Sequence, residues 1–259
     1  MRKTALITGA SSGIGHELAC IHAQQGGDLV IVARSEDKLQ SLKEKLEQQY
    51  SVSVNVFVKD LAQTNAAQEL YNEVINSNIQ VDYLVNNAGF GQVGNFHELP
   101  WDRLGSMIQL NIMALTQLTH LFLPDFVRRN SGKVLNVSST ASLMPGPLQA
   151  VYFATKAYVT SLSNALAEEL SKTNVTITNL MPGATETDFG STSGMDKTAL
   201  FANTASAEKV AQIGYQAMLD GKLDIMAGLS ATQKFMMSVV PLTPKKLLLK
   251  QVYQLQQTE

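Results

Sequence analysis

Cysteine is nearly missing from this sequence. Cys20 is the only cysteine in 259 residues, which excludes an internal disulfide. Neither Cys20 nor the histidines have the spacing of metal ligands, so we expect no metal site; the histidines are His16, His22, His97 and His120. The setting of Cys20 in "ELACIHA" is typical of a small hydrophobic residue buried on a helix face. The scarcity of cysteine fits a reducing compartment, and we expect a cytoplasmic protein.

An excess of one charge and long apolar runs are missing as well. The chain carries 22 acidic and 20 basic residues, with a formal net charge of −2. Without a basic excess, a nucleic-acid partner is not expected. No stretch reaches the roughly 18 apolar residues of a membrane-spanning helix, and the N-terminal "MRKTALITG" lacks the apolar region of a signal peptide. We therefore expect no transmembrane span.

Two patterns alternate along the chain. Short runs rich in Val, Ile and Leu predict buried strands, and longer segments with helical spacing separate them. The expected strands are 4–8, 29–33, 52–58, 81–85, 133–137 and 175–180, with a weaker one at 223–227. The expected helices are 14–25, 36–49, 63–77, 101–129, 150–172 and 206–220. This alternation predicts an α/β fold, a doubly wound parallel sheet of about seven strands with helices on both faces.

No convincing linker interrupts residues 1–259, so we expect a single domain. The longest irregular stretch, 184–205, is rich in Gly, Ser and Thr. A loop this long inside a compact domain is usually functional, and a mobile lid explains it better than a domain boundary does. The C-terminal segment 228–259 mixes an apolar run, two prolines and a lysine pair. We expect it to pack over the substrate site or a partner subunit; contact with a membrane surface is the less expected alternative.

The string "TGASSGIG" at 8–15 lies where the first expected strand meets the first expected helix. Glycines in such a turn let the backbone approach a pyrophosphate, which then sits at the helix N-terminus. The glycines are Gly9, Gly13 and Gly15. Further hydrogen bonds are available from Ser11, Ser12 and the amide of Ile14. A tight turn without a ligand is the alternative, but strand, glycines and helix in this order predict a Rossmann-type dinucleotide site.

The end of the second expected strand, "IVARSEDKL", bears on the choice of dinucleotide. An NAD site usually has an acidic residue at this point, which binds the ribose 2′-hydroxyl. Here Ala33 occupies that position and Arg34 follows. An arginine suits a 2′-phosphate, so the sequence favours NADP(H) over NAD(H). A solvated surface cation is the alternative for Arg34.

Further strings follow in fixed order: "KDL" at 59–61, "NNAG" at 86–89, "NVSS" at 136–139, "YFATK" at 152–156 and "PGATET" at 182–187. With "TGASSGIG", they make the chain resemble the short-chain dehydrogenase/reductase family, in its single-domain branch. The resemblance implies that Asp60 and Leu61 lie beside the adenine of the cofactor. It also implies that Asn87, Ala88 and Gly89 line the cofactor groove.

The resemblance further implies a catalytic set of Asn111, Ser139, Tyr152 and Lys156. Tyr152 and Lys156 are four residues apart, so they share one helix face; on its own such a pair is often an ordinary surface contact. By resemblance, Tyr152 exchanges the proton, while Lys156 lowers the pKa of Tyr152 and binds the nicotinamide ribose.

The same resemblance assigns supporting roles. Ser139 would stabilise charge on the substrate oxygen, with Ser138 as the rival assignment. Asn111 would help to hold a water that links Lys156 to solvent. The carboxamide of the nicotinamide would be held by Pro182, Gly183, Thr185 and Thr187.

The implied activity is hydride transfer between NADP(H) and a carbonyl or secondary alcohol. Two alternatives stay open: a non-catalytic NADP-binding regulator, and an epimerase-type reaction with transient oxidation. The substrate pocket is expected from 90–96, 142–149 and 184–205, where Phe90, Leu143, Met144, Pro145 and Phe189 favour an apolar, aromatic or amphiphilic carbonyl. Homo-oligomers are usual in the family, so we expect a dimer or tetramer formed through the helices at 101–129 and 150–172.

Overall fold

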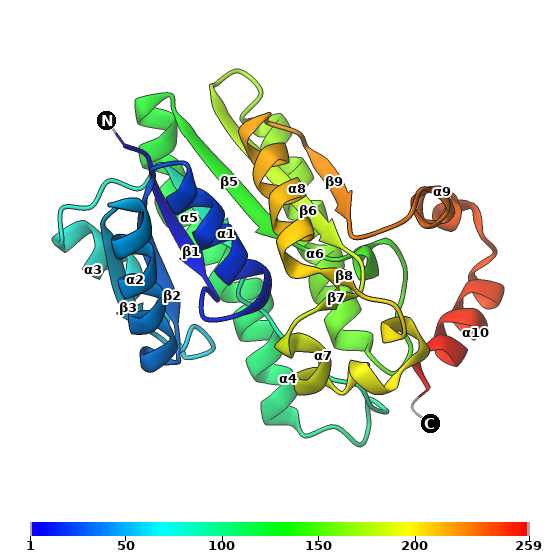
Figure 1. Ribbon diagram of the computed structural model, residues 1–259. Helices are drawn as coiled ribbons and strands as arrows, with labels where there is room; N and C mark the ends of the chain where they lie inside the picture. Colours follow the sequence, from blue (N-terminus) through cyan, green and yellow to red (C-terminus); the bar gives the residue numbers. More distant parts are fainter. Residues whose placement is uncertain (1, 258–259) are drawn as a thin grey trace.

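The computed structural model describes residues 2–257. Its centre is a sheet of seven parallel strands in the order β3-β2-β1-β4-β5-β6-β9 (Figure 1). The strands are β1 (Thr4–Thr8), β2 (Asp28–Ala33), β3 (Val54–Val58), β4 (Tyr83–Asn86), β5 (Gly132–Val137), β6 (Val175–Pro182) and β9 (Asp224–Ala227). The predicted doubly wound parallel sheet is confirmed, and every predicted strand is present with small shifts of its ends.

Helices cover both faces of this sheet. One face carries α1 (Gly13–Gln24), α2 (Glu36–Tyr50) and α8 (Ala207–Leu219), and the other carries α3 (Ala66–Asn76), α5 (Leu115–Arg129) and α6 (Ala150–Glu169). Along β1, Ala5 and Ile7 pack into the first layer while Leu6 packs into the second. Because both faces are buried, the strands are continuously apolar rather than alternating.

The predicted helix 101–129 is interrupted in its middle. It consists of α4 (Trp101–Ile108), a π-helical segment η1 (Gln109–Ala114) and α5. Asn111 lies in the π-helical segment and is buried. A single π turn within an α-helix is uncommon and occurs often at functional sites.

Residues 184–205 are more structured than the composition predicted. Two short strands, β7 (Thr185–Glu186) and β8 (Ala205–Ser206), pair in parallel at the two ends of the segment. Between them lie α7 (Asp188–Ser193) and the 3-10 turns η3 (Met195–Lys197) and η4 (Ala199–Phe201). The prediction of an irregular loop is therefore wrong in detail, since most of the segment is helical.

After β9 the chain forms α9 (Ala231–Val239), the 3-10 turn η5 (Val240–Leu242) and α10 (Lys245–Gln256). These elements project from the β9 end of the sheet (Figure 1). Among residues 2–257, no helix combines the length and the apolar character needed to cross a membrane.

Candidate active site

The carboxyl ends of the parallel strands meet at one edge of the sheet, toward the bottom of Figure 1. The strand order reverses between β1 and β4, and ligands of open α/β sheets bind at such a switch point. A cavity of about 960 Å³ lies there, lined by residues that follow β1, β2, β3, β4, β5, β6 and β9. Its volume is at the upper end of the range for ligand sites, as a large ligand would need.

The turn after β1 has no room for a side chain at Gly9, Gly13 or Gly15. Gly9 and Gly13 have positive φ angles of 68° and 56°. A Cβ at Gly9 would lie 2.9 Å from Asn87 Nδ2, and one at Gly15 would lie 2.3 Å from the Gly9 carbonyl oxygen. The turn leaves the amino end of α1 open to the cavity, as anion binding requires; Ser11, Ser12 and Ile14 also line it.

Asn87 and Thr8 tie the loop after β4 to this turn. The Asn87 side chain donates hydrogen bonds to the carbonyls of Thr8 (2.9 Å) and Gly9 (3.3 Å). The Thr8 hydroxyl accepts from the amides of Asn87 and Ala88, both at 3.0 Å. Asn87, Ala88 and Gly89 line the cavity as expected. The role of Thr8 was missed, although it is the first residue of the glycine string.

The far end of the cavity holds the residues expected near the adenosine. Arg34, Asp60 and Leu61 all line it. Arg34 is exposed, and within residues 2–257 it has neither an ion pair nor a side-chain hydrogen bond. Lys38, one helical turn later, lines the same end and forms an ion pair with Asp188 of α7, Nζ to Oδ2 3.6 Å. The sequence predicted only Arg34 as a cation at this end of the cavity, and Lys38 is a second one.

Tyr152 and Lys156 lie on the cavity wall rather than on an exposed face of α6. Their exposed fractions are 6% and 5%. Lys156 Nζ donates a 2.8 Å hydrogen bond to the Val137 carbonyl and lies 5.8 Å from the centroid of the Tyr152 ring. The two side chains therefore share one buried site.

The two candidate serines have different surroundings. The Ser138 hydroxyl is buried and donates to the Lys156 carbonyl at 2.9 Å, with Thr160 Oγ1 also 2.9 Å away. The Ser139 hydroxyl is only half-buried and accepts a hydrogen bond from the Ala141 amide at 3.1 Å. It also donates to the Pro182 carbonyl at 3.5 Å, and it lowers the pKa of the neighbouring Tyr152 phenol. Because the Ser138 hydroxyl is buried and already hydrogen-bonded within the protein, Ser139 is the better candidate to contact a ligand.

Burial dominates the electrostatics of this site. It raises the pKa of Tyr152 to about 12, and the polar Ser139 hydroxyl nearby offsets only part of the rise. Burial also lowers the pKa of Lys156 to about 8. The expectation that Lys156 depresses the pKa of Tyr152 is wrong for this structure, because desolvation of the phenolate outweighs any effect of the cation. At neutral pH, Tyr152 is therefore a protonated phenol able to donate.

Asn111 holds the loop after β4 against α6. Its Nδ2 donates to the Phe90 carbonyl (3.0 Å) and to Thr155 Oγ1 (3.1 Å), and its Oδ1 accepts from the Phe90 amide (3.1 Å). The Thr155 hydroxyl in turn donates to the Tyr152 carbonyl at 2.7 Å. Asn111 does not line the cavity. It positions the Tyr152 segment through Thr155, a link that the sequence did not suggest.

The remaining cofactor candidates lie on the segment that runs from the end of β6 through β7 to the N-cap of α7. Pro182, Gly183, Thr185 and Thr187 all line the cavity. The Thr185 hydroxyl donates to the Gly183 carbonyl at 2.9 Å, and the Thr187 hydroxyl accepts from the Phe189 amide at 3.3 Å. A Cβ at Gly13 would lie 2.8 Å from Thr187 Cγ2, so the N-cap of α7 packs directly on the glycine turn.

The other half of the cavity is apolar. Tyr152 faces Phe189, with ring centroids 5.4 Å apart, and Arg103 stacks over Phe90 at 4.2 Å. Its other apolar lining includes Met144, Phe153, Met195, Phe201, Met237 and Val252. Of the expected segment 142–149 only Met144 lines the cavity, so Leu143 and Pro145 are not wall residues. Helices α9 and α10 supply the wall instead.

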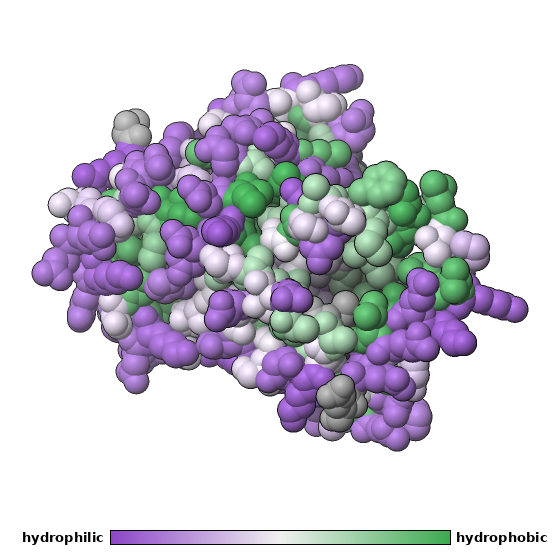
Figure 2. Space-filling model, turned by 45° about the vertical axis from the view of Figure 1, so that its right-hand side comes forward, coloured by the Kyte–Doolittle hydropathy of each residue, from purple (hydrophilic) through white to green (hydrophobic). Residues whose placement is uncertain are grey.

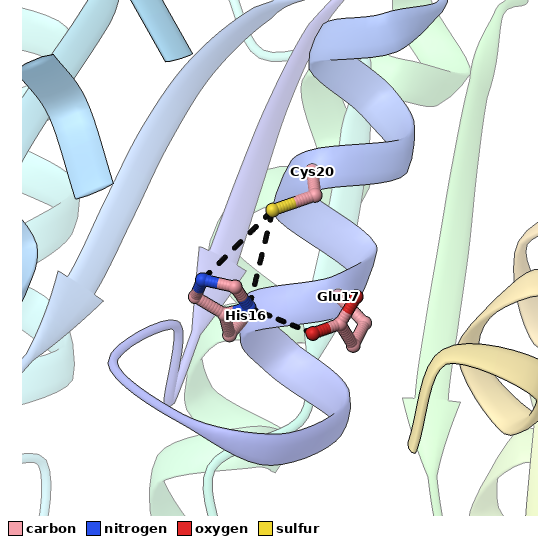
Figure 3. Close-up of side chains that lie close together, drawn as sticks. All are labelled: His16, Glu17 and Cys20. Atoms are coloured by element: carbon pink, nitrogen blue, oxygen red, sulfur yellow. Dashed lines mark hydrogen bonds and ion pairs between the residues drawn. The ribbon is translucent and has the colours of Figure 1, made fainter. Parts of the chain in front are cut away.

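A second cluster lies on α1 and includes none of the candidate catalytic residues. His16, Glu17 and Cys20 bring three potential ligand atoms within 4.8 Å of one another (Figure 3). The expectation of no ligand spacing overlooked His16 and Cys20, which are one turn apart on the same face. Cys20 is half-buried rather than buried, and burial raises the pKa of its thiol. This disfavours the thiolate that a metal needs, and we assign the cluster no role.

Known proteins resemble this chain in sequence and in fold. A family profile described as "short chain dehydrogenase" matches residues 3–198. A very-long-chain 3-oxoacyl-CoA reductase of Laccaria bicolor is 37% identical over 180 residues, covering 68% of this chain but only 53% of the reductase, so the chain spans about half of that relative's length. The uncharacterized oxidoreductase YvaG of Bacillus subtilis is 34% identical over 186 residues, and the match covers 72% of this chain and 69% of the YvaG chain. The structure of a short-chain dehydrogenase from Sphingobium yanoikuyae in complex with NADPH is 28% identical and superimposes with a TM-score of 0.84, covering 95% of each chain.

Proposed function

The chain belongs to the short-chain dehydrogenase family, and from that membership we propose that it transfers a hydride between NADP(H) and a carbonyl or secondary alcohol. One observation carries the proposal: Ser139, Tyr152 and Lys156 lie on the wall of the same cavity that contains the glycine turn. Its glycine end suits the phosphates of a dinucleotide, and its apolar end suits an organic carbonyl. NADP(H), when bound, supplies or accepts the hydride.

Each catalytic side chain has a task that its surroundings support. In the reducing direction, Tyr152 donates its phenolic proton to the substrate oxygen, since its raised pKa keeps it protonated at neutral pH. Ser139 donates a hydrogen bond to the same oxygen as charge develops there. Lys156 carries a proton below about pH 8 and stabilises the phenolate that remains after transfer. Asn111 acts as a positioning residue through Thr155.

The preference for NADP(H) over NAD(H) rests on the end of β2. Among residues 2–257 Arg34 has no ion-pair or side-chain hydrogen-bond partner, and Lys38, which pairs with Asp188, is one turn away, so a 2′-phosphate would lie near two cations. At the end of β2, where an NAD site usually has an acidic residue that binds the ribose 2′-hydroxyl, this chain has Ala33. The relative crystallised with NADPH is consistent with this choice.

An apolar or amphiphilic carbonyl is the substrate class that the cavity favours. Phe90, Phe153 and Phe189 surround the space beside Tyr152. The Laccaria relative, a very-long-chain 3-oxoacyl-CoA reductase, supports an acyl substrate. Homo-oligomer formation stays a prediction; Met113 and Tyr158 are exposed on the helices that would form the interface. The cytoplasmic location likewise stays a prediction.

The test compares three variants on helix α6. Tyr152→Phe should lower turnover of an accepted carbonyl at least ~100-fold with NADPH affinity unchanged, because only the proton donor is lost. Lys156→Ala should lower both turnover and affinity. Tyr158→Phe is the matched control, since Tyr158 lies on the same helix and its hydroxyl contacts only Thr116 among residues 2–257. Steady-state rates and NADPH fluorescence titrations give both quantities. Near-normal turnover of Tyr152→Phe would refute the proposal.

A further inference from the structure

The C-terminal elements carry an apolar surface that nothing else in the described part of the chain, residues 2–257, covers. None of the residues of α9 is buried, although the helix contains Phe235, Met236 and Val239. Phe235 is 69% exposed and Leu242 of η5 is 83% exposed. Further exposed apolar residues on α10 are Leu247, Leu249, Tyr253 and Leu255. We call the exposed side chains of α9, η5 and α10 the C-terminal face; hydrophobic residues gather on this side of the molecule in Figure 2.

Internal packing does not account for this surface. An isolated helix the length of α9 (Ala231–Val239) is marginal in water and normally gains its stability from a buried face. Contiguous exposed apolar residues on a soluble protein mark a surface that meets another molecule or a membrane. The C-terminal face is therefore the part of the described chain that most needs a partner.

The charge of this segment indicates what the partner is. Residues 225–257 contain Lys234, Lys245, Lys246 and Lys250 but no aspartate, glutamate or arginine. All four lysines are exposed. Lysine beside Leu, Met and Phe is the composition of helices that lie in the interface of an anionic bilayer.

A second copy of the chain fits this surface less well. A two-fold contact places the same patch on both partners, so it must be complementary to itself. Two C-terminal faces brought together would place lysines opposite lysines with no acid from residues 225–257 to pair with them. An anionic lipid surface satisfies both the apolar and the basic side chains.

The C-terminal face is continuous with the cavity. Gln233 and Met237 of α9, and Val252 and Leu255 of α10, line its apolar half. Leu255 belongs to both surfaces, since it lines the cavity and is 44% exposed. A molecule dissolved in a membrane under this face would meet the apolar end of the cavity.

We propose that the C-terminal face docks on an anionic phospholipid surface and opens the cavity toward it. Phe235 and Leu242 enter the interface, while Lys245, Lys246 and Lys250 lie among the headgroups. The docking does not depend on catalysis. The entry of a lipophilic carbonyl from the membrane rests on the proposed function.

Sedimentation with vesicles tests the docking, using the full chain without cofactor. The protein should bind vesicles of phosphatidylcholine and phosphatidylglycerol, bind phosphatidylcholine alone much more weakly, and be released by salt. Lys245→Glu/Lys246→Glu should lower the partition coefficient at least ~25-fold, because each lysine near an anionic surface contributes about fivefold. Phe235→Ser/Leu242→Ser should also lose binding. Both pairs are exposed, so folding is expected to be retained, and circular dichroism checks this.

Two matched controls lie on other parts of the chain. Lys45→Glu/Lys172→Glu changes the net charge by the same amount at exposed lysines, and Ile75→Ser removes an exposed apolar side chain from α3; both should bind like the wild type. Absence of binding to anionic vesicles, or equal loss in the controls, would overturn the docking. So would a change of oligomeric state, by light scattering, in the C-terminal variants alone, since it would show that a second copy covers the face.

A kinetic arm separates the docking from the activity. With a lipophilic ketone dissolved in anionic vesicles, Lys245→Glu/Lys246→Glu should raise KM, whereas KM for a water-soluble ketone should stay unchanged. Equal effects on both ketones would refute entry from the membrane. Vesicle binding without turnover of any carbonyl would refute the proposed function and leave the docking intact.

Discussion

Replacement of Lys156 by methionine should remove the activity without lowering the stability of the protein at neutral pH. Lys156 is buried as a cation, and its pKa falls from 10.5 to about 8. That depression corresponds to roughly 3 kcal/mol of lost stability at neutral pH. Loss of the hydrogen bond to the Val137 carbonyl offsets about 1–3 kcal/mol of the gain. Lys156→Met should therefore be as stable as the wild type at pH 7, or more stable by up to about 2 kcal/mol.

The pH dependence gives the sharper test. Between pH 8 and 10.5 the unfolded chain keeps the Lys156 proton that the folded protein has lost, so wild-type stability rises with pH through this window. Between pH 7 and pH 9, the stability of Lys156→Met relative to the wild type should fall by about 1 kcal/mol. Urea unfolding at the two pH values measures this difference.

Tyr152→Phe is the control for this experiment. The pKa of Tyr152 lies near 12 when folded and near 10 when unfolded, so Tyr152 hardly titrates below pH 9 in either state. The stability difference between Tyr152→Phe and the wild type should stay constant from pH 7 to pH 9. A constant difference for Lys156→Met as well would refute the claim that Lys156 is a buried, destabilised cation.

Three further predictions follow from the cavity. Arg34→Ala should weaken NADPH binding roughly ten- to a hundredfold, because it removes a charge-assisted hydrogen bond, and should leave NADH binding unchanged. Titration of both proteins with both cofactors measures this, and equal losses of affinity for NADPH and NADH would contradict it. Ser139→Ala should lower turnover at least ~10-fold, whereas Ser138→Ala, which loses two buried contacts, should mainly lower the melting temperature. Amides of residues 184–205 should gain hydrogen-exchange protection when NADPH binds; full protection in the free protein would exclude a lid.

The sheet and the glycine turn could be predicted because their signals are local. The apolar runs of β1 and β2 follow from burial on both faces, and Gly9 and Gly13 occur where φ must be positive. The motif residues at the strand ends reach one cavity because parallel strands end at one edge. Thr8 and Lys38 could have been found from the same strings, since each is next to, or one turn from, a predicted site residue.

Other features depend on contacts that no local pattern contains. The π-helical segment around Asn111 has the same apolar spacing as the α-helix that was predicted, so the sequence does not distinguish the two. The pKa of Tyr152 is raised because the side chain is buried, and Phe189 of α7 and Val252 of α10 help to bury it. Those residues follow Tyr152 by some 40 and 100 positions in the sequence. The placement of α9 and α10 against the cavity likewise depends on tertiary contacts between segments that are far apart in the sequence.

The central claim is that Tyr152, Ser139 and Lys156 perform net reduction of a carbonyl with NADPH. The most direct measurement incubates the wild-type protein and NADPH with each of a panel of apolar ketones. NADPH absorbance is followed, and the alcohol product is quantified in parallel. The account predicts that one alcohol forms for each NADPH consumed, with little consumption when NADH replaces NADPH. Tight NADPH binding without consumption on any ketone would contradict it in favour of a regulator. Conversion of a substrate without net consumption would contradict it in favour of an epimerase.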